Sequence, residues 1–307
     1  MQLRAGDFTD GWANFEWRHK RSSRSSPEEP LRVFERRWSG GESIAGKRIL
    51  LRCEQGLGDT IQFCRFASLV ASLQAEVLLE VQRPLLTLLA SVQGVAHVLE
   101  KGAEAEFDYQ YPLMSLPLAL NIKLATIPSA SPYLWNDPAK VAAWEDRLGA
   151  KAKPRIGLFW SGSGNQRADR RSVPLEELVR RLSTRFQFVS LQRDVSEPEA
   201  KLLGARPDVL HFGAELHDFS DTGALCECMD LVITIDTSVA HLSGALGKRT
   251  LILLGQNPDW RWLMNREDSP WYPTVSLFRQ GASSTWGETL ARVFTELEQG
   301  NQIAWQA

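Results

Sequence analysis

The amino-acid sequence predicts an α/β protein with two doubly wound domains. Strand-like apolar runs alternate with helix-like runs in two blocks, one from residue 47 to about residue 134 and one from residue 155 onward. Such alternation builds parallel sheets with right-handed crossovers. The proline- and serine-containing stretch 127–132 separates the blocks as a linker would. A chain of 307 residues is long enough for two domains.

The expected elements follow from the spacing of apolar residues. Residues 1–46 indicate a short helix, with Trp12 and Phe15 on one face, and then a basic, serine-rich loop. In the first block we expect helices at 60–72 and 84–91 and strands at 48–53, 76–81 and 96–99. In the second block we expect strands at 155–160, 186–191, 209–212, 231–235 and 250–254, and helices at 175–182, 220–229, 239–246 and 285–299. The expected domains are therefore 1–46, 47–135 and 136–307, with the two sheet domains facing each other across a cleft.

Composition and charge exclude several classes of protein. The hydrophobic content of 43% and the charged content of 23% are ordinary for a folded protein. A net charge of −2 argues against a nucleic-acid binder, which would carry a basic surplus. No apolar run is long enough to span a bilayer, and the first residues lack an apolar signal core. We therefore expect a cytoplasmic protein without a transmembrane segment and leave peripheral membrane association open.

The four cysteines indicate buried, inert thiols. Cys53 and Cys64 fall in an apolar strand and an apolar helix, and Cys226 and Cys228 point to different faces of a helical run. No spacing of cysteine and histidine resembles a metal site, so no metal is expected.

A glycine turn follows the first expected strand. Its sequence is Glu54-Gln55-Gly56-Leu57-Gly58-Asp59-Thr60. Open α/β sheets bind ligands at the carboxyl ends of their strands, and glycines let a backbone approach a substrate closely. Asp59 therefore lies where a catalytic base could act. The alternative is a carboxylate that only stabilises the start of the following helix.

A second polar turn follows the expected strand 231–235. Asp236 ends the strand, and Thr237 or Ser238 can cap the next helix, whose first N–H groups would suit a diphosphate. Plain helix capping explains the same residues about as well. His241 is as consistent with packing as with binding a phosphate or a sugar.

The loop 160–174 could supply the other half of an anion site. Ser161, Gly162 and Asn165 lie in its glycine-containing part, and Arg171 could bind phosphate oxygens in a bidentate manner. A solvated basic loop is the alternative. This loop and residues 236–238 follow strands of one sheet, and we therefore favour binding.

The sequence contains incomplete versions of two nucleotide-binding motifs. Residues 41–48 nearly match a Walker A loop, but Arg48 replaces the magnesium-binding hydroxyl and the motif precedes its strand. Gly56 and Gly58 lack the third glycine of the dinucleotide fingerprint, which would fall at Ile61. A P-loop protein and a dehydrogenase are therefore disfavoured. Two tryptophans at 260 and 262 could stack on a base, but packing is the favoured interpretation.

Taken together, these motifs resemble the C-terminal part of bacterial tetratricopeptide-repeat (TPR) proteins with a glycosyltransferase domain. That domain is similar to the heptosyltransferases of glycosyltransferase family 9, which have the GT-B fold. The resemblance runs through nearly the whole chain. The segments that carry it are Gly6-Asp7-Phe8, Gly11-Trp12, Glu16-Trp17-Arg18, residues 54–63, residues 236–242, Pro258-Asp259-Trp260-Arg261-Trp262 and Asp268-Ser269-Pro270-Trp271-Tyr272-Pro273.

The resemblance implies roles for single residues. Asp59 matches the family's proposed catalytic base, and Asp236-Thr237 matches a pair that holds donor sugar and phosphate. Arg171 replaces a phosphate-binding lysine, which keeps the charge but changes the geometry, and Asp194 loosely matches an acidic donor ligand. The full set expected to bind substrate and donor is Gly56, Gly58, Gln62, Ser161, Gly162, Asn165, Arg171, Gln192, Asp194, Asp236, Thr237, Ser238 and His241.

The same resemblance implies an inverting, metal-independent glycosyltransferase without a cofactor. A nucleotide-diphosphate sugar would be the donor, and Asp59 would deprotonate the acceptor hydroxyl. Heptosyltransferases act on the lipopolysaccharide core and lack repeats, whereas this chain begins inside what resembles a last TPR repeat of a longer or shortened relative. Repeat arrays bind peptides, so a protein acceptor is considered beside a glycan. The rivals are a non-catalytic binding protein of the same fold, and a hydrolase or epimerase on the same scaffold.

Overall fold

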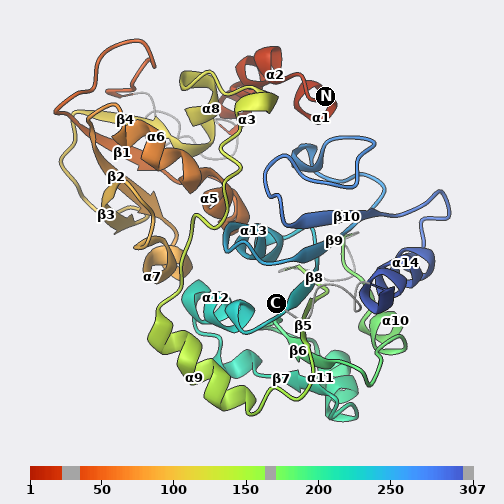
Figure 1. Ribbon diagram of the computed structural model, residues 1–307. Helices are drawn as coiled ribbons and strands as arrows, with labels where there is room; N and C mark the ends of the chain where they lie inside the picture. The colour runs from red at the N-terminus through yellow and green to blue at the C-terminus, as the bar shows by residue number, and fades with distance from the viewer. Residues whose placement is uncertain (23–34, 163–170, 300–307) are drawn as a thin grey trace. The chain divides into compact units, whose positions relative to one another are not determined.

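The computed structural model describes residues 1–22, 35–162 and 171–299 (Figure 1). The chain divides into two compact units. Unit 1 contains residues 1–135 and also the short segment 260–265, and unit 2 contains residues 136–259 and the chain from residue 266 on. Each unit has its own sheet, and all strand pairs are parallel. The predicted α/β class with parallel sheets is confirmed.

Unit 1 has a four-stranded sheet in the order β3-β2-β1-β4. Its strands are β1 (Arg48–Arg52), β2 (Glu76–Val81), β3 (Val95–Glu100) and β4 (Tyr109–Pro112). Its helices are α1 (Gln2–Ala5), α2 (Phe8–Phe15), α3 (Trp17–Ser22), α5 (Leu57–Phe63), α6 (Ala67–Ala71), α7 (Leu86–Leu89) and α8 (Leu116–Ala119). Short 3-10 turns are η1 (Cys64–Phe66), η2 (Arg83–Leu85), η3 (Leu113–Ser115), η4 (Leu124–Thr126) and η6 (Trp260–Trp262).

Unit 2 has a six-stranded sheet in the order β10-β9-β8-β5-β6-β7. The strands are β5 (Arg155–Phe159), β6 (Gln187–Ser190), β7 (Val209–His211), β8 (Leu231–Ile235), β9 (Thr250–Leu254) and β10 (Val275–Arg279). The helices are α9 (Pro138–Leu148), α10 (Leu175–Val179), α11 (Glu197–Gly204), α12 (Phe219–Glu227), α13 (Ser238–Ala245) and α14 (Trp286–Gln299), with one 3-10 turn, η5 (Gly213–Glu215). Counted from β5, this is the doubly wound order 3-2-1-4-5-6, which reverses direction between β5 and β8.

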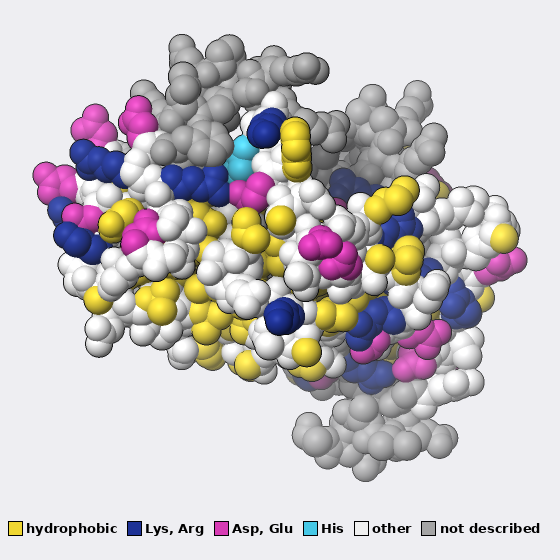
Figure 2. Space-filling model, turned by 90° about the horizontal axis from the view of Figure 1, so that it is seen from above, with side chains coloured by type: hydrophobic (Ala, Val, Ile, Leu, Met, Phe, Trp, Pro, Cys, Tyr) yellow, Lys and Arg dark blue, Asp and Glu magenta, His cyan; other side chains and the backbone are white. Residues whose placement is uncertain are grey.

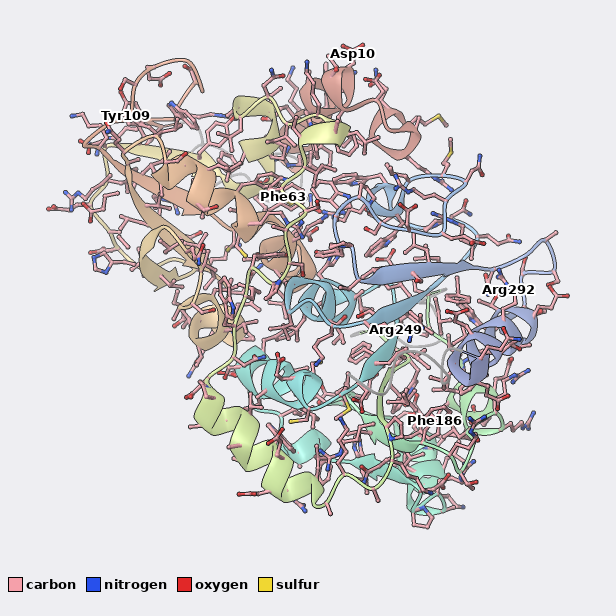
Figure 3. The ribbon with its side chains drawn as sticks, in the orientation of Figure 1. Asp10, Phe63, Tyr109, Phe186, Arg249 and Arg292 are labelled. Atoms are coloured by element: carbon pink, nitrogen blue, oxygen red, sulfur yellow. The ribbon has the colours of Figure 1, made fainter. Side chains whose placement is uncertain are left out.

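Apolar side chains on alternate strand positions explain how helices cover the sheet of unit 2. Ile156, Leu158 and Ile233 point into a core that α10, α11 and α14 complete. On α14 the apolar residues recur at helical spacing, and Leu290 and Val293 are fully buried. Phe186, labelled in Figure 3, belongs to the same core at the start of β6.

Several expected elements differ from the structure. Residues 57–71 form the two helices α5 and α6, separated by η1, instead of one helix from 60 to 72. α5 begins at Leu57, where the carboxylate of Asp59 accepts the backbone N–H of Gly56. The expected helix 84–91 is a 3-10 turn followed by the single turn α7, and α10 ends at Val179 instead of 182. The edge strands β4 and β10 were not expected. β4 is only four residues long and ends in proline, so its local pattern is weak.

All four cysteines are buried, as expected. Burial raises the pKa of Cys53, Cys64 and Cys226 to about 12 and that of Cys228 to about 11. Thiolates are the reactive form, so these side chains are inert in the folded protein.

We therefore predict that the native protein does not react with an aromatic disulfide reagent at mildly alkaline pH, because both burial and the raised pKa suppress the thiolate. The same reagent should report four thiols after unfolding in guanidinium chloride. Rapid reaction of the native protein would contradict the buried positions of these thiols.

Candidate functional site

The glycine turn of unit 1 follows β1. The strand order of this sheet, β3-β2-β1-β4, reverses between β1 and β4. β1 ends at Arg52 and the turn leads into α5. Gln55 has a positive φ of 50°, which is costly for a residue with a side chain. Gln82 Nε2 donates to the carbonyl of Gln55, and Glu54 accepts from the backbone N–H of Met114. These contacts hold the backbone of the turn in one conformation.

Asp59 is held through both carboxylate oxygens. Its Oδ2 accepts the backbone N–H of Gly56 at 2.7 Å, and its Oδ1 forms an ion pair with Arg261. The Asp59 side chain is 17% exposed and that of Arg261 is 6% exposed. The expected capping role of Asp59 is therefore present, and it coexists with a buried charge partner that local sequence does not indicate. The catalytic role of Asp59 stays a prediction.

Gln62 and Gly58 lie on the same short helix as Asp59. Gln62 is fully buried, and its Oε1 accepts from Arg261 Nε at 2.5 Å. Its Nε2 is buried without a hydrogen-bond partner among the described residues. Gly58 is half-buried, whereas Gly56 is exposed at the helix start. Gln62 thus faces the protein interior, and its contact with substrate stays a prediction.

In unit 2, residues from two loops meet at the point where the strand order reverses. Ser161 and Gly162 follow β5 and are buried, and Asp236 follows the neighbouring strand β8. The hydroxyl of Ser161 has no hydrogen-bond partner within the described part of the chain. Arg171 donates to the backbone carbonyl of Asp236 at 3.1 Å. The structure therefore brings the two predicted loops together at the crevice where open sheets bind ligands.

The turn after β8 leads into α13 without a side-chain cap from its N-cap residue. Thr237 is the N-cap of α13, but its side chain does not cap the helix and instead donates to the carbonyl of Ile235 at 3.4 Å. Asp236 is 8% exposed, and its Oδ2 lies 3.4 Å from the backbone N of Asp259. Thr237 and Ser238 are half-buried. Simple side-chain capping by Thr237, one of the two interpretations of this motif, is thus not what the structure shows.

Three other predicted site residues have structural partners. Gln192 braces the loop after β5, since its Nε2 donates to the carbonyl of Ser161 and its Oε1 accepts from the N–H of Ser161. His241 is buried with its Nδ1 2.9 Å from the hydroxyl of Tyr272. Asp194 is exposed and pairs with Arg193 at 3.0 Å. Their roles in donor binding stay predictions, and Asn165 lies outside the described residues.

Sequence analysis missed Arg261 and Tyr272 as partners of site residues. Each lies in one of the two tryptophan-rich segments near the end of the chain, 258–262 and 268–273. These segments carried the family resemblance but predicted no site residue. Their contacts join residues far apart in sequence, since Arg261 and Asp59 are 202 positions apart. The single hint was an arginine between two tryptophans, which is compatible with burial of its charge.

Within residues 1–22, 35–162 and 171–299, no group of three or more acidic, histidine or cysteine side chains could hold a metal ion. On the face shown in Figure 2, acidic and basic side chains are interspersed with apolar ones instead of being separated by sign. In the part of the chain that the structure describes, no helix has the length and apolar character needed to cross a membrane.

Known proteins that are similar to this chain include a curated relative and several solved structures. No family model matches the chain. Protein FlbA of Caulobacter vibrioides is 29% identical over 324 residues, a match that covers 96% of this chain and 53% of FlbA. The chain thus spans about half the length of this curated relative.

Solved structures with the same fold include glycosyltransferases of family 9. A family 9 glycosyltransferase of Veillonella parvula matches with a TM-score of 0.61 at 10% identity, covering 87% of this chain and 93% of that one. The ADP-heptose lipopolysaccharide heptosyltransferase II of E. coli matches with a TM-score of 0.58 at 14% identity, covering 82% and 98%. The dodecameric, iron-containing glycosyltransferase TibC of E. coli matches with a TM-score of 0.56 at 12% identity, covering 85% and 79%. The chain has the α/β fold of family 9 heptosyltransferases.

Close packing at Gly244 fixes the helix that carries the Asp236 turn. A Cβ atom at Gly244 would lie 2.6 Å from two ring carbons of Tyr272, the partner of His241. We predict that Gly244→Ala lowers the free energy of unfolding by about 1–3 kcal/mol, because the ring must shift in a filled core. Urea unfolding measures this loss.

The matched control is Gly204→Ala at the end of α11, where an added Cβ meets no atom within 4 Å. This change should be neutral or stabilising by up to about 1 kcal/mol, since alanine favours helices over glycine. Equal stability of the two variants would show that Tyr272 does not constrain α13.

Proposed function

We propose that the protein transfers a sugar from a nucleotide-diphosphate sugar to an acceptor hydroxyl, with inversion and without a metal ion. The observation that carries the proposal is the meeting of the Ser161 loop and the Asp236 turn at the reversal point of a six-stranded parallel sheet. Family 9 heptosyltransferases with the same fold support it, and the solved structures include one with ADP and one with an ADP-heptose analogue. An ADP-sugar is therefore the donor that we propose first.

The donor diphosphate would bind at the turn after β8. The first N–H groups of α13, which the Thr237 side chain does not cap, and the guanidinium of Arg171 provide positive potential for phosphate oxygens. The buried hydroxyl of Ser161, which has no hydrogen-bond partner within the described residues, offers a donor or acceptor to the same ligand. We propose a metal-independent reaction because the sequence has no Asp-x-Asp pair, and arginine and backbone amides would balance the charge.

The chemical step would be a single displacement at the anomeric carbon. The acceptor oxygen forms the new bond to that carbon as its proton passes to Asp59. The bond to the phosphate oxygen breaks at the same time, and the nucleoside diphosphate leaves with the added negative charge. Arg171 and the first N–H groups of α13 would stabilise that charge.

The arrangement of the two units belongs to the proposal. In a GT-B enzyme, such units close on the donor and the acceptor and exclude water. We propose residues 1–46 as the end of a TPR region, 47–135 as the acceptor domain and 136–307 as the donor domain. The acceptor would be a glycan or a protein, and the reaction would take place in the cytoplasm, with peripheral membrane association as a further possibility.

One observation favours a second candidate, a binding protein without turnover. Both oxygens of Asp59 already have partners, a backbone N–H and Arg261. A carboxylate oxygen has two lone pairs, so the contacts leave room for a proton from substrate. They also suit a purely structural carboxylate, and only measurement separates the two functions.

The test of the donor site is a thermal-shift panel of ADP, UDP, GDP, CMP, CDP and dTDP. A ligand that binds only the folded protein raises the melting temperature with its concentration. We expect one nucleotide to stabilise the wild type and to lose its effect in Arg171→Ala and Asp236→Ala. Stabilisation by none of them would argue against the donor site.

For the catalytic role we predict that Asp59→Asn lowers turnover at least about 100-fold, because general-base catalysis contributes about 10²–10⁴-fold. Donor binding should remain, since the donor residues lie in unit 2. The measurement is transfer of labelled sugar, with nucleotide binding by thermal shift as the control. Unchanged turnover would remove Asp59 as the base, and the absence of transfer by the wild type with every donor would favour the binding protein.

A further inference from the structure

We infer that Arg261 is the positioning residue for Asp59, a role that rests on the proposed function of Asp59 as the base. Arg261 lies in η6, in a segment that comes from the second half of the chain but belongs to unit 1. It contacts the carboxylate of Asp59 and the amide of Gln62, two residues on one face of α5. The segment 260–265 therefore completes the turn that β1 and α5 begin.

The guanidinium of Arg261 is fixed in place from several sides. It lies 4.5 Å from the ring centroid of Trp260 and 5.6 Å from that of Phe63, distances typical of cation–π contacts. Its Nε donates to Gln62 Oε1 at 2.5 Å, while Nη2 pairs with Asp59 Oδ1. A planar group held along two edges and on its faces has little freedom to turn.

The backbone that carries Arg261 is anchored by an aromatic cluster, defined as Trp12, Phe15, Phe63 and Trp260. The ring of Trp260 lies 5.4 Å from that of Trp12, 5.6 Å from that of Phe15 and 6.5 Å from that of Phe63. Phe63 is labelled in Figure 3 and is fully buried at the end of α5. Trp262, the residue after Arg261, is also fully buried. η6 is thus part of the core of unit 1.

The consequence for Asp59 is a carboxylate fixed in both position and charge. Gly56 holds Oδ2 and Arg261 holds Oδ1, so the plane of the group cannot rotate freely. A base held in the productive orientation spares the reaction an ordering cost. A guanidinium paired with Asp59 also favours the ionised carboxylate, which is the form that accepts a proton.

Other charged groups on neighbouring elements have their own partners. Arg18 on α3 pairs with Glu54 in the turn, and Arg65 in η1 donates to the carbonyl of Gln62 and to the hydroxyl of Tyr133. Arg261, in contrast, pairs directly with Asp59. A buried ion pair is weak evidence of stabilisation by itself, and the test must separate positioning from folding.

The test compares Arg261→Lys and Arg261→Gln with the wild type. Lysine keeps the charge but cannot contact Gln62 and Asp59 along two edges. We expect Arg261→Lys to fold, to keep the nucleotide thermal shift, and to lose about 10-fold or more in kcat with the KM for donor changed little, since small misplacements cost up to about 100-fold. ADP-heptose is the donor probe, and a heat-treated bacterial lysate is the acceptor mixture.

The matched control is Arg37→Lys in the same unit. Arg37 pairs with Glu16 at 2.6 Å, and both side chains are 20% exposed. The substitution makes the same chemical change at an ion pair with a different carboxylate, and we expect its kcat to stay close to that of the wild type. Equal kcat values for Arg261→Lys, Arg37→Lys and the wild type would overturn the inference.

A second measurement needs no turnover. Carbon-13 NMR of labelled aspartate carboxyls, assigned with Asp59→Asn, follows the titration of Asp59 directly. We expect the pKa of Asp59 to be higher in Arg261→Gln than in the wild type, because the cation that favours the carboxylate is gone. An unchanged titration in a folded variant would overturn the inference. A wild type that transfers no sugar would defeat the proposed function instead, while the NMR result would still decide whether Arg261 controls Asp59.

Discussion

Parallel pairing of neighbouring strands determines where the polar groups of each unit can gather. The carboxyl ends of parallel strands lie at one edge, and a crevice opens where the strand order reverses. In unit 2 that reversal falls between β5 and β8, and in unit 1 it falls between β1 and β4. Residues after β5, β8 and β1 therefore lie at the position where open parallel sheets generally bind ligands. The candidate site follows from this constraint before any single side chain is considered.

The two units use their crevices in different ways. In unit 2 the start of α13 has no side-chain cap from Thr237, and the buried hydroxyl of Ser161 has no hydrogen-bond partner among the described residues, features that suit an anion. In unit 1 the turn after β1 is filled by contacts, and its carboxylate meets an arginine from a distant segment. One crevice thus offers positive potential to a ligand, and the other offers an oriented negative charge.

The segment 260–265 completes unit 1, although it is distant in sequence from residues 1–135. It adds Trp262 to the core, places the half-buried Trp260 against Trp12 and brings Arg261 to the Asp59 turn. The N-terminal helix α2 contributes to the same core through Trp12, whose indole N–H donates to the carbonyl of Ile122. Burial of the tryptophans by packing, the favoured interpretation from sequence, agrees with these contacts. Unit 1 is thus assembled from two segments that are distant in the sequence, 1–135 and 260–265.

Local patterns in the sequence were sufficient for the α/β class. Where apolar spacing is regular, as in β2 and β8, the strands start at their expected residues. Local patterns also sufficed for the glycine turn and the Asp236 turn, because both follow a buried strand and precede a helix. The edge strands β4 and β10, the bracing of Ser161 by Gln192 and the pairing of Asp59 with Arg261 were decided by tertiary structure alone. The physical reason is that strand partners and charge partners are chosen by three-dimensional proximity, which a local pattern does not contain when 202 positions separate the two residues.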